Sequence, residues 1–88
     1  MIIWDESKNI KLKIERNISF EIIGDIILNK NYLDILENPS KPSQNIFVVE
    51  IDNYIYAVPF IFDKDLNIIL KTAYPSRKLN KKYKRSKK

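Results

Sequence analysis

Residues 46–62 read IFVVEIDNYIYAVPFIF, two apolar runs rich in β-branched and aromatic residues that flank Asp52-Asn53. Two such runs joined by two residues predict a β-hairpin, and the Asp-Asn pair suits a type I′ turn even without the usual glycine. The turn also fixes the register of the hairpin. The expected pairs are Ile51 with Tyr54, Val49 with Tyr56 and Phe47 with Val58.

A third strand is predicted at residues 68–74, after a connection at residues 63–67. The expected pairs with the hairpin are Phe62 with Ile68, Phe60 with Leu70, Val58 with Thr72 and Tyr56 with Tyr74. One face of this meander is apolar and aromatic throughout, so it is expected to pack against helices. Pro59 cannot donate to a ladder, which predicts a bulge or an edge at that position.

The opposite face of the predicted sheet is also apolar. Its residues are Ile46, Val48, Ile55, Ala57, Ile61, Ile69 and Ala73, together with Glu50, Pro59 and Lys71. A surface of this kind is too apolar to lie in water. Either the C-terminal helix or a partner protein is therefore expected to cover it.

Two helices are predicted before the sheet, over residues 5–16 and 20–30, with Asp5 and Ser19 as N-caps. Asn17, which tolerates the left-handed conformation, is expected to close the first helix. The apolar side of the first is expected at Ile10 and Ile14, which are spaced i, i+4. Gly24 lies inside the second helix, and we interpret this only glycine of the chain as the site of a close helix crossing.

Shorter segments complete the chain. Residues 2–4 are an apolar lead-in that suits an edge strand, residues 32–37 suit a short strand, and residues 38–43 form a loop rich in proline and serine. Ser76 is expected to cap a final basic helix at residues 77–84, with fraying at residues 85–88. The sequence thus predicts one α+β domain, 1–88, in which two N-terminal helices pack on a small antiparallel sheet of three to four strands, followed by a short basic C-terminal helix.

Charge is distributed unevenly along the chain. Residues 71–88 hold nine of the sixteen basic residues and no acidic one, a net charge of +9. The first seventy residues carry seven basic and eleven acidic side chains, a net charge of −4. A block of like charge at this density usually contacts a polyanion or an acidic protein surface.

The composition excludes several kinds of site. The chain has no cysteine and no histidine, so it lacks thiol nucleophiles, the usual zinc ligands and the usual general base. One glycine cannot build a phosphate-binding loop, and no acidic cluster suggests a metal, so neither metal nor cofactor is expected. No signal peptide or membrane span is visible, which predicts a cytoplasmic location and no membrane partner.

The remaining chemistry is that of Lys and Arg grouped with tyrosines. Cations hold phosphates and stabilise a pentacoordinate phosphate, aromatic rings stack on unpaired bases, and the RNA 2′-hydroxyl supplies an internal nucleophile. This pattern favours RNA binding and leaves open whether the bound RNA is also cleaved. Two alternatives stay open: a non-catalytic basic RNA- or DNA-binding module, and a structural subunit whose tail meets an acidic protein. Tyr54 and Tyr56 alternate on the core face and are more typical of core residues.

Motifs at both ends of the chain resemble a known family. The sequence opens with Trp4-Asp5-x-x-Lys8-Asn9 and Arg16-Asn17-Ile18-Ser19-Phe20-Glu21, and closes with Lys71-Thr72-x-x-x-Ser76-Arg77-Lys78 and Tyr83. These runs resemble the W-D-x-x-K-N … K-H-G-V-S-F-E opening and the R-x-I-S-A-R-x-A-T-x-x-E-x-x-x-Y ending of BrnT-type toxins. The sequence departs from that pattern at Arg16, where the family commonly has histidine, and in lacking the glutamate of the C-terminal helix.

The resemblance implies a RelE-like fold and a metal-independent endoribonuclease that cleaves RNA and arrests growth as the toxin of a type II toxin–antitoxin system. It also implies a cognate DNA-binding antitoxin that neutralises the toxin and links it indirectly to operator DNA. The expected catalytic residues are Arg77, Lys78, Lys71 and Arg16. The expected RNA-binding residues are Lys13, Lys81, Lys82 and Tyr83.

Overall fold

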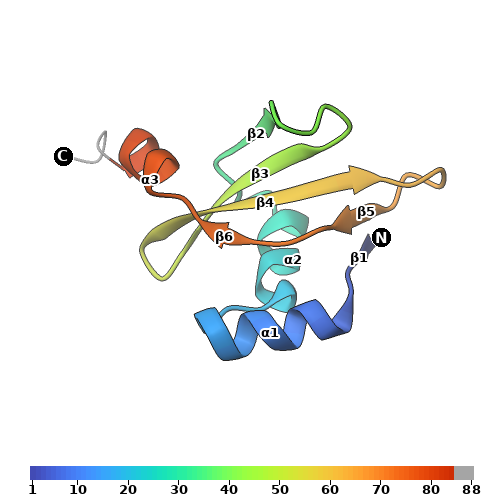
Figure 1. The fold of residues 1–88 in the computed structure, drawn as a ribbon, viewed down its shortest axis with the longest axis horizontal. Helices are drawn as coiled ribbons and strands as arrows, with labels where there is room; N and C mark the ends of the chain where they lie inside the picture. Colours follow the sequence, from blue (N-terminus) through green and yellow to red (C-terminus); the bar gives the residue numbers. More distant parts are fainter. Residues whose placement is uncertain (85–88) are drawn as a thin grey trace.

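The computed structural model describes residues 1–84, which form an α+β fold with three helices and one mixed sheet of six strands (Figure 1). In chain order the elements are β1 (Ile2–Ile3), α1 (Glu6–Arg16), α2 (Phe20–Leu28), β2 (Asp34–Glu37), β3 (Asn45–Ile51), β4 (Tyr54–Phe62), β5 (Ile68–Leu70), β6 (Tyr74–Pro75) and α3 (Arg77–Lys84). The fraying predicted for residues 85–88 lies outside the described residues.

The sheet is larger than the three to four strands predicted, and it is not purely antiparallel. Its order is β1-β5-β4-β3-β2, with β6 also paired to β4. The extra strands are β1, which pairs in parallel with β5, and β6, which results from an interruption of the third long strand. The sequence did indicate an edge strand at the amino end, but nothing in a two-residue strand specifies its partner.

The hairpin forms as predicted. Asp52 and Asn53 both have positive φ, 51° and 68°, as a type I′ turn requires. The pairs Ile51–Tyr54, Val49–Tyr56 and Phe47–Val58 are all present. The turn chemistry was therefore sufficient to set the register of the two longest strands.

The third strand starts in the predicted register and then leaves it. Its first part pairs as expected, but after Leu70 the pairing stops and resumes with an offset of one residue. The observed pairs beyond the break are Ala57 with Tyr74 and Tyr56 with Pro75, so the predicted pairs Val58–Thr72 and Tyr56–Tyr74 are wrong.

Pro59 explains the offset. Its carbonyl accepts the Lys71 amide at 2.9 Å, so its nitrogen, which has no hydrogen, faces the same neighbouring segment and cannot continue the ladder. The bulge expected at this proline is therefore confirmed. Because one residue is inserted, Ala73 turns into the core and Tyr74 turns outward, the reverse of the predicted alternation.

Helix α1 begins and ends where the sequence indicated. Asp5 accepts the Ser7 amide at 2.9 Å as N-cap, and Asn17 closes the helix in the left-handed conformation, with φ of 57°. The predicted apolar side is wrong, because the buried residues of α1 are Asn9 and Leu12, whereas Ile14 is 78% exposed and Ile10 is also exposed.

Asn9 sets this orientation of α1. Its side chain is fully buried, and its Oδ1 accepts the amide of Phe20, the first residue of α2, at 2.7 Å. The first amides of a helix have no partner within the helix, so a buried helix start needs an acceptor from elsewhere. Asn9 provides that acceptor, and the isoleucines consequently face outward.

Helix α2 begins as predicted, with Ser19 Oγ accepting the Ile22 amide at 3.2 Å, and ends at Leu28, two residues earlier than expected. The interpretation of Gly24 as a close helix crossing is wrong. A Cβ placed there would meet only the Trp4 ring, at an ordinary contact distance of 3.7 Å. The space beside Gly24 is therefore not filled by a second helix.

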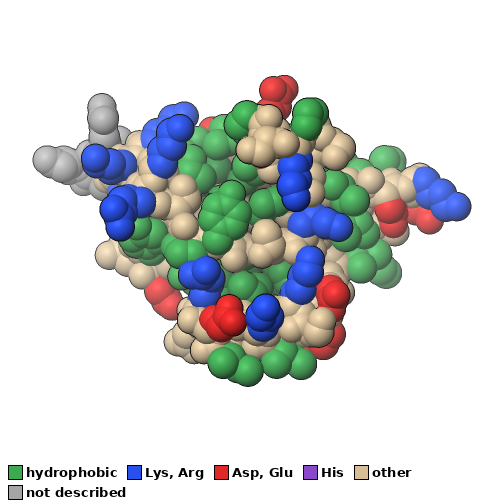
Figure 2. Space-filling view, viewed as in Figure 1, with side chains coloured by type: hydrophobic (Ala, Val, Ile, Leu, Met, Phe, Trp, Pro, Cys, Tyr) green, Lys and Arg blue, Asp and Glu red, His purple; other side chains and the backbone are tan. Residues whose placement is uncertain are grey.

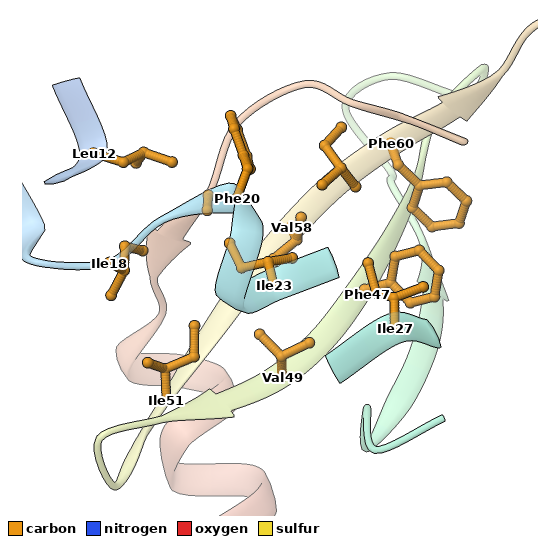
Figure 3. Close-up of a cluster of buried hydrophobic side chains, with 12 residues drawn as sticks. Leu12, Ile18, Phe20, Ile23, Ile27, Phe47, Val49, Ile51, Val58 and Phe60 are labelled. Carbon is orange, nitrogen blue, oxygen red and sulfur yellow. The ribbon is translucent and has the colours of Figure 1, made fainter. Parts of the chain in front are cut away.

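The core lies between these helices and one face of the sheet (Figure 3). Phe20, Ile23 and Ile27 of α2 point toward the sheet residues Val49, Val58 and Phe47. Phe47 and Phe60 stack with ring centroids 4.2 Å apart, near Ile27 at one end of the cluster (Figure 3). These side chains are almost fully buried and supply most of the apolar stabilisation.

The second face of the sheet is covered by α3, one of the two covers that the sequence left open. The Ile55 amide donates to Asn80 Oδ1 at 3.1 Å, and Lys84 Nζ lies 3.0 Å from Glu50 Oε2. Residues beneath this helix, such as Val48 and Ile55, are fully buried. No helix among residues 1–84 combines the length and the apolar character that a membrane crossing requires.

Candidate nucleic-acid interface

Two adjoining hollows lie where α1, the segment between β5 and β6, and the β2–β3 loop meet. Their volumes are about 350 and 240 Å³, and both are lined by Lys8, Thr72 and Tyr74. Their cationic and aromatic lining residues, here called the basic cleft, are Lys8, Lys11, Arg16, Lys41, Lys71 and Tyr74. Figure 2 shows Lys and Arg side chains crossing the middle of this face between α1 and the β2–β3 loop.

Each wall of the basic cleft is held by a specific contact. Lys8 Nζ donates to the Lys71 carbonyl at 3.1 Å, which fastens α1 to the bulged segment. In the loop, the Ser40 amide donates to Asn38 Oδ1 at 3.1 Å and the Gln44 amide donates to the Lys41 carbonyl at 2.9 Å. The cations of the cleft therefore come from three parts of the chain that the fold brings together.

The charge of the basic cleft is strongly positive. Five cationic side chains line the two hollows, against one carboxylate, that of Glu15. A hollow lined by one sign of charge concentrates ions of the other sign and accelerates their association. The cleft thus suits a polyanion.

Tyr74 lies in both hollows, and 40% of the residue is exposed. Its position follows from the bulge at Pro59, since the uninterrupted register would have placed it in the core. An exposed aromatic ring flanked by cations can stack on an unpaired base while the cations contact the neighbouring phosphates. Tyr74 was not predicted as a base-stacking residue because a regular strand would have buried it in the core.

The predicted catalytic residues fall into two groups. Lys71 lines the first hollow and Arg16 the second, so the fold brings these two to the basic cleft. Arg77 and Lys78 are exposed in the first turn of α3, which Ser76 caps through a 3.2 Å hydrogen bond from the Leu79 amide. They follow Tyr74 closely in the chain but line neither hollow.

Lys13 faces α2 instead of the basic cleft. Its Nζ lies 3.8 Å from Glu21 Oε1. The pKa of Glu21 lies below its usual value, mainly because Asn9 donates a hydrogen bond to it and to a lesser extent because Lys13 is near. The structure thus gives Lys13 an acidic neighbour on α2.

Tyr83 has a structural partner. Its hydroxyl donates to Asp34 Oδ2 at 2.6 Å, which joins α3 to the edge strand β2. This hydrogen bond, with burial and the nearby charge, raises the pKa of Tyr83 to about 12, and it also lowers the pKa of Asp34. Lys82 lies over the Tyr83 ring, 5.4 Å from its centroid, and Lys81 is exposed on the same helix.

Three cations of the basic cleft, Lys8, Lys11 and Lys41, were not among the predicted site residues. Lys8 stands in the amino-terminal motif, so the sequence held a signal for it, but Lys41 lies in a loop without any signal. Among residues 1–84, no group of three or more carboxylates is placed to hold a metal ion. Comparison with family models, with curated proteins and with solved structures finds no match for this chain.

Proposed function

We propose that this chain is a metal-independent endoribonuclease, the toxin of a type II toxin–antitoxin system, and that it cleaves single-stranded RNA bound in the basic cleft. The observation that carries the proposal is the exposed Tyr74 ring between Lys71 and Arg16, in hollows lined by five cations. The motifs at both ends of the chain, which resemble BrnT-type toxins, support the proposed class.

RNA binding follows from the geometry of the basic cleft. One base stacks on Tyr74, and the phosphates on either side of it contact Lys71 and Lys41 in one hollow and Arg16 in the other. Duplex RNA does not offer an unstacked base, so this arrangement favours single strands. Stacking on one aromatic ring is worth about 1–3 kcal/mol by alanine substitution.

Cleavage uses the RNA's own nucleophile. The 2′-oxygen attacks the adjacent phosphorus, the bond from phosphorus to the 5′-oxygen breaks, and the proton of the 2′-hydroxyl finally resides on the leaving 5′-oxygen. The products are a 2′,3′-cyclic phosphate and a 5′-hydroxyl. Lys71 and Arg16 stabilise the charge of the pentacoordinate phosphate, and Arg77 and Lys78 contact the strand beyond Tyr74.

The proposal also includes the fold, partner and location that the family resemblance implies. The helix–helix–sheet–helix order is compatible with a RelE-like fold. The partner is a cognate DNA-binding antitoxin, through which the toxin reaches operator DNA, and the site of action is the cytoplasm.

The test uses purified protein and a labelled single-stranded RNA in EDTA. Lys71→Ala and Arg16→Ala are expected to lower the cleavage rate at least about tenfold, because each removes a cation from the transition state. Tyr74→Ala is expected to weaken RNA binding by about tenfold or more. The matched control is Lys64→Ala, which removes the same charge from the turn after β4, away from the basic cleft.

A second substrate sharpens the test. RNA with 2′-deoxyribose at the cleaved position should bind normally and stay intact. Full cleavage of that substrate, or equal rates for Lys64→Ala and Lys71→Ala, would contradict the proposed mechanism. Growth arrest by the induced wild type, relieved by Lys71→Ala at equal protein levels, tests the toxin assignment separately.

The second candidate is a non-catalytic RNA-binding module, favoured by the absence of histidine and cysteine from the chain. It predicts binding in the same cleft without cleavage at any protein concentration. Affinity would then fall steeply with salt, by roughly 0.7 log units per log unit of salt for each phosphate contacted in a single strand.

A further inference from the structure

The hydrophobic core is open at one end. Helix α2 stops at Leu28, while the aromatic face of the sheet continues to Phe62, leaving a hollow of about 400 Å³. Phe47 and Phe60, both nearly fully buried, form part of its wall. Figure 3 shows these two rings together beside Ile27, at one end of the cluster.

A second apolar hollow of about 480 Å³ adjoins the first, and the two share Met1, Ile2 and Leu28. Gly24 lines the second hollow beside Trp4. Glycine inside a helix costs about 1 kcal/mol relative to alanine. Since a Cβ at Gly24 would make only an ordinary contact, the packing of this fold does not require glycine. The bare backbone instead leaves room for a group from outside.

Large apolar side chains protrude around these hollows. Met1 is 86% exposed, Leu28 is 70% exposed and Phe62 is 55% exposed. We call the two hollows and these three side chains the apolar face. Contiguous apolar surface beside an open core is typical of an interface.

We propose that the apolar face binds a second copy of this chain, forming a two-fold symmetric dimer. A two-fold interface must be complementary to itself, and this face carries both protruding side chains and hollows to receive them. Its charges are also complementary. Glu21 and Asp25 line the hollow at one end of the face and Lys30 lines the hollow at the other, so a two-fold axis between the hollows brings the acidic end of one copy toward Lys30 of the other.

The dimer leaves the basic cleft free. No residue lining the two apolar hollows also lines either hollow of the basic cleft. Each copy therefore keeps an open RNA site. The dimer proposal does not depend on the proposed ribonuclease activity.

The test is sedimentation equilibrium of the purified chain from low micromolar to several hundred micromolar concentration. The wild type is expected to show a monomer–dimer equilibrium, and Leu28→Asp to raise the dissociation constant at least about tenfold. Ile14→Asp is the matched control, because it makes the same substitution at an exposed apolar residue of α1, outside the apolar face.

Charge reversal tests whether Asp25 of one copy lies near Lys30 of the other in the proposed dimer. Asp25→Lys and Lys30→Asp are each expected to weaken the dimer several-fold, and the double variant is expected to restore it. Circular dichroism checks that each variant is folded. A wild type that stays monomeric over the whole range, a dimer unaffected by Leu28→Asp, or a double variant weaker than either single one would overturn the proposal.

Discussion

Replacing Asn9 by alanine tests the contact that orients α1 on α2. Asn9 is fully buried, and its side-chain oxygen is 2.7 Å from the Phe20 nitrogen at the start of α2. Its side-chain nitrogen donates to Glu21 at 2.9 Å. Alanine removes both contacts at once and leaves the Phe20 amide without an acceptor in a site closed to water.

The expected loss of stability in Asn9→Ala follows from the buried amide of Phe20. Leaving a buried donor unsatisfied costs about 1–3 kcal/mol, and the bond to Glu21 adds up to about 1 kcal/mol at the partly exposed end. We therefore expect the free energy of unfolding to fall by about 2–3 kcal/mol. For a domain of this size that lowers Tm by roughly 10–20 °C, since 1 kcal/mol corresponds to about 4–8 °C.

Urea denaturation followed by far-UV circular dichroism measures this loss. Asn31→Ala is the control, because it removes an exposed asparagine side chain from the connection after α2. Asn9→Asp should keep the acceptor for Phe20 but place a carboxylate beside Glu21, so its loss should grow as the pH rises above about 5. A loss below about 0.5 kcal/mol for Asn9→Ala would show that the Phe20 amide finds another partner, and the argument for α1's orientation would fail.

Three further predictions concern stability. Leu12→Ala should cost about 2–4 kcal/mol in urea denaturation, while Ile14→Ala should change the free energy of unfolding by less than about 0.5 kcal/mol; equal losses would contradict the observed orientation of α1. Gly24→Ala should stabilise the monomer by roughly 0.5–1 kcal/mol, measured at low concentration, and a loss would show that the added methyl clashes. Tyr83→Phe should destabilise the protein by an amount that is constant between about pH 5 and 10 and falls progressively below and above that range. The lowered pKa of Asp34 gives stability that is lost as pH falls, and the Tyr83 pKa of about 12 gives stability that is lost as pH rises above about 10, so a pH-independent difference would exclude the hydrogen bond as its cause.

The features predicted correctly are those set by neighbouring residues. The type I′ turn at Asp52-Asn53, the caps at Asp5 and Ser19, and the left-handed Asn17 each depend on the chemistry of a few consecutive residues. Register along a hairpin follows from its turn, which is why the pairs between β3 and β4 agree with prediction. The turn between β3 and β4 does not determine how far the segment after β4 keeps its register with β4.

The buried side of α1 could not be predicted from periodicity. Ile10 and Ile14 have the spacing of a buried stripe, and Asn9 has the polarity of a surface residue. Which side of α1 is buried depends on the amide of Phe20, which has no acceptor within its own helix and needs Asn9. Phe20 lies eleven residues away from Asn9 and belongs to another helix. The spacing of apolar residues does not show which hydrogen-bond partners a buried helix end needs.

The basic cleft shows the same limit. The sequence indicated cations at the end of the sheet and named Lys71 and Arg16, which the fold does bring together. It placed Tyr74 in the core, because alternation was assumed to continue past Pro59. A proline known to interrupt a ladder should therefore be taken as a point where the inward and outward faces exchange, and the residues beyond it should be considered in both orientations.

Two variants can test whether RNA binding depends on the bulge at Pro59. Its missing donor produces the bulge, and the bulge turns Tyr74 into the basic cleft while placing the small Ala73 in the core. If RNA recognition depends on this geometry, Pro59→Val should weaken binding by restoring the regular register, even though it removes no charge and no aromatic ring. Tyr74→Phe, which keeps both the register and the stacking surface, should bind normally. Unchanged binding by Pro59→Val, with Tyr74 shown by assigned NMR signals of its ring to remain exposed, would mean that the chain beyond Leu70 is bulged for reasons other than the proline.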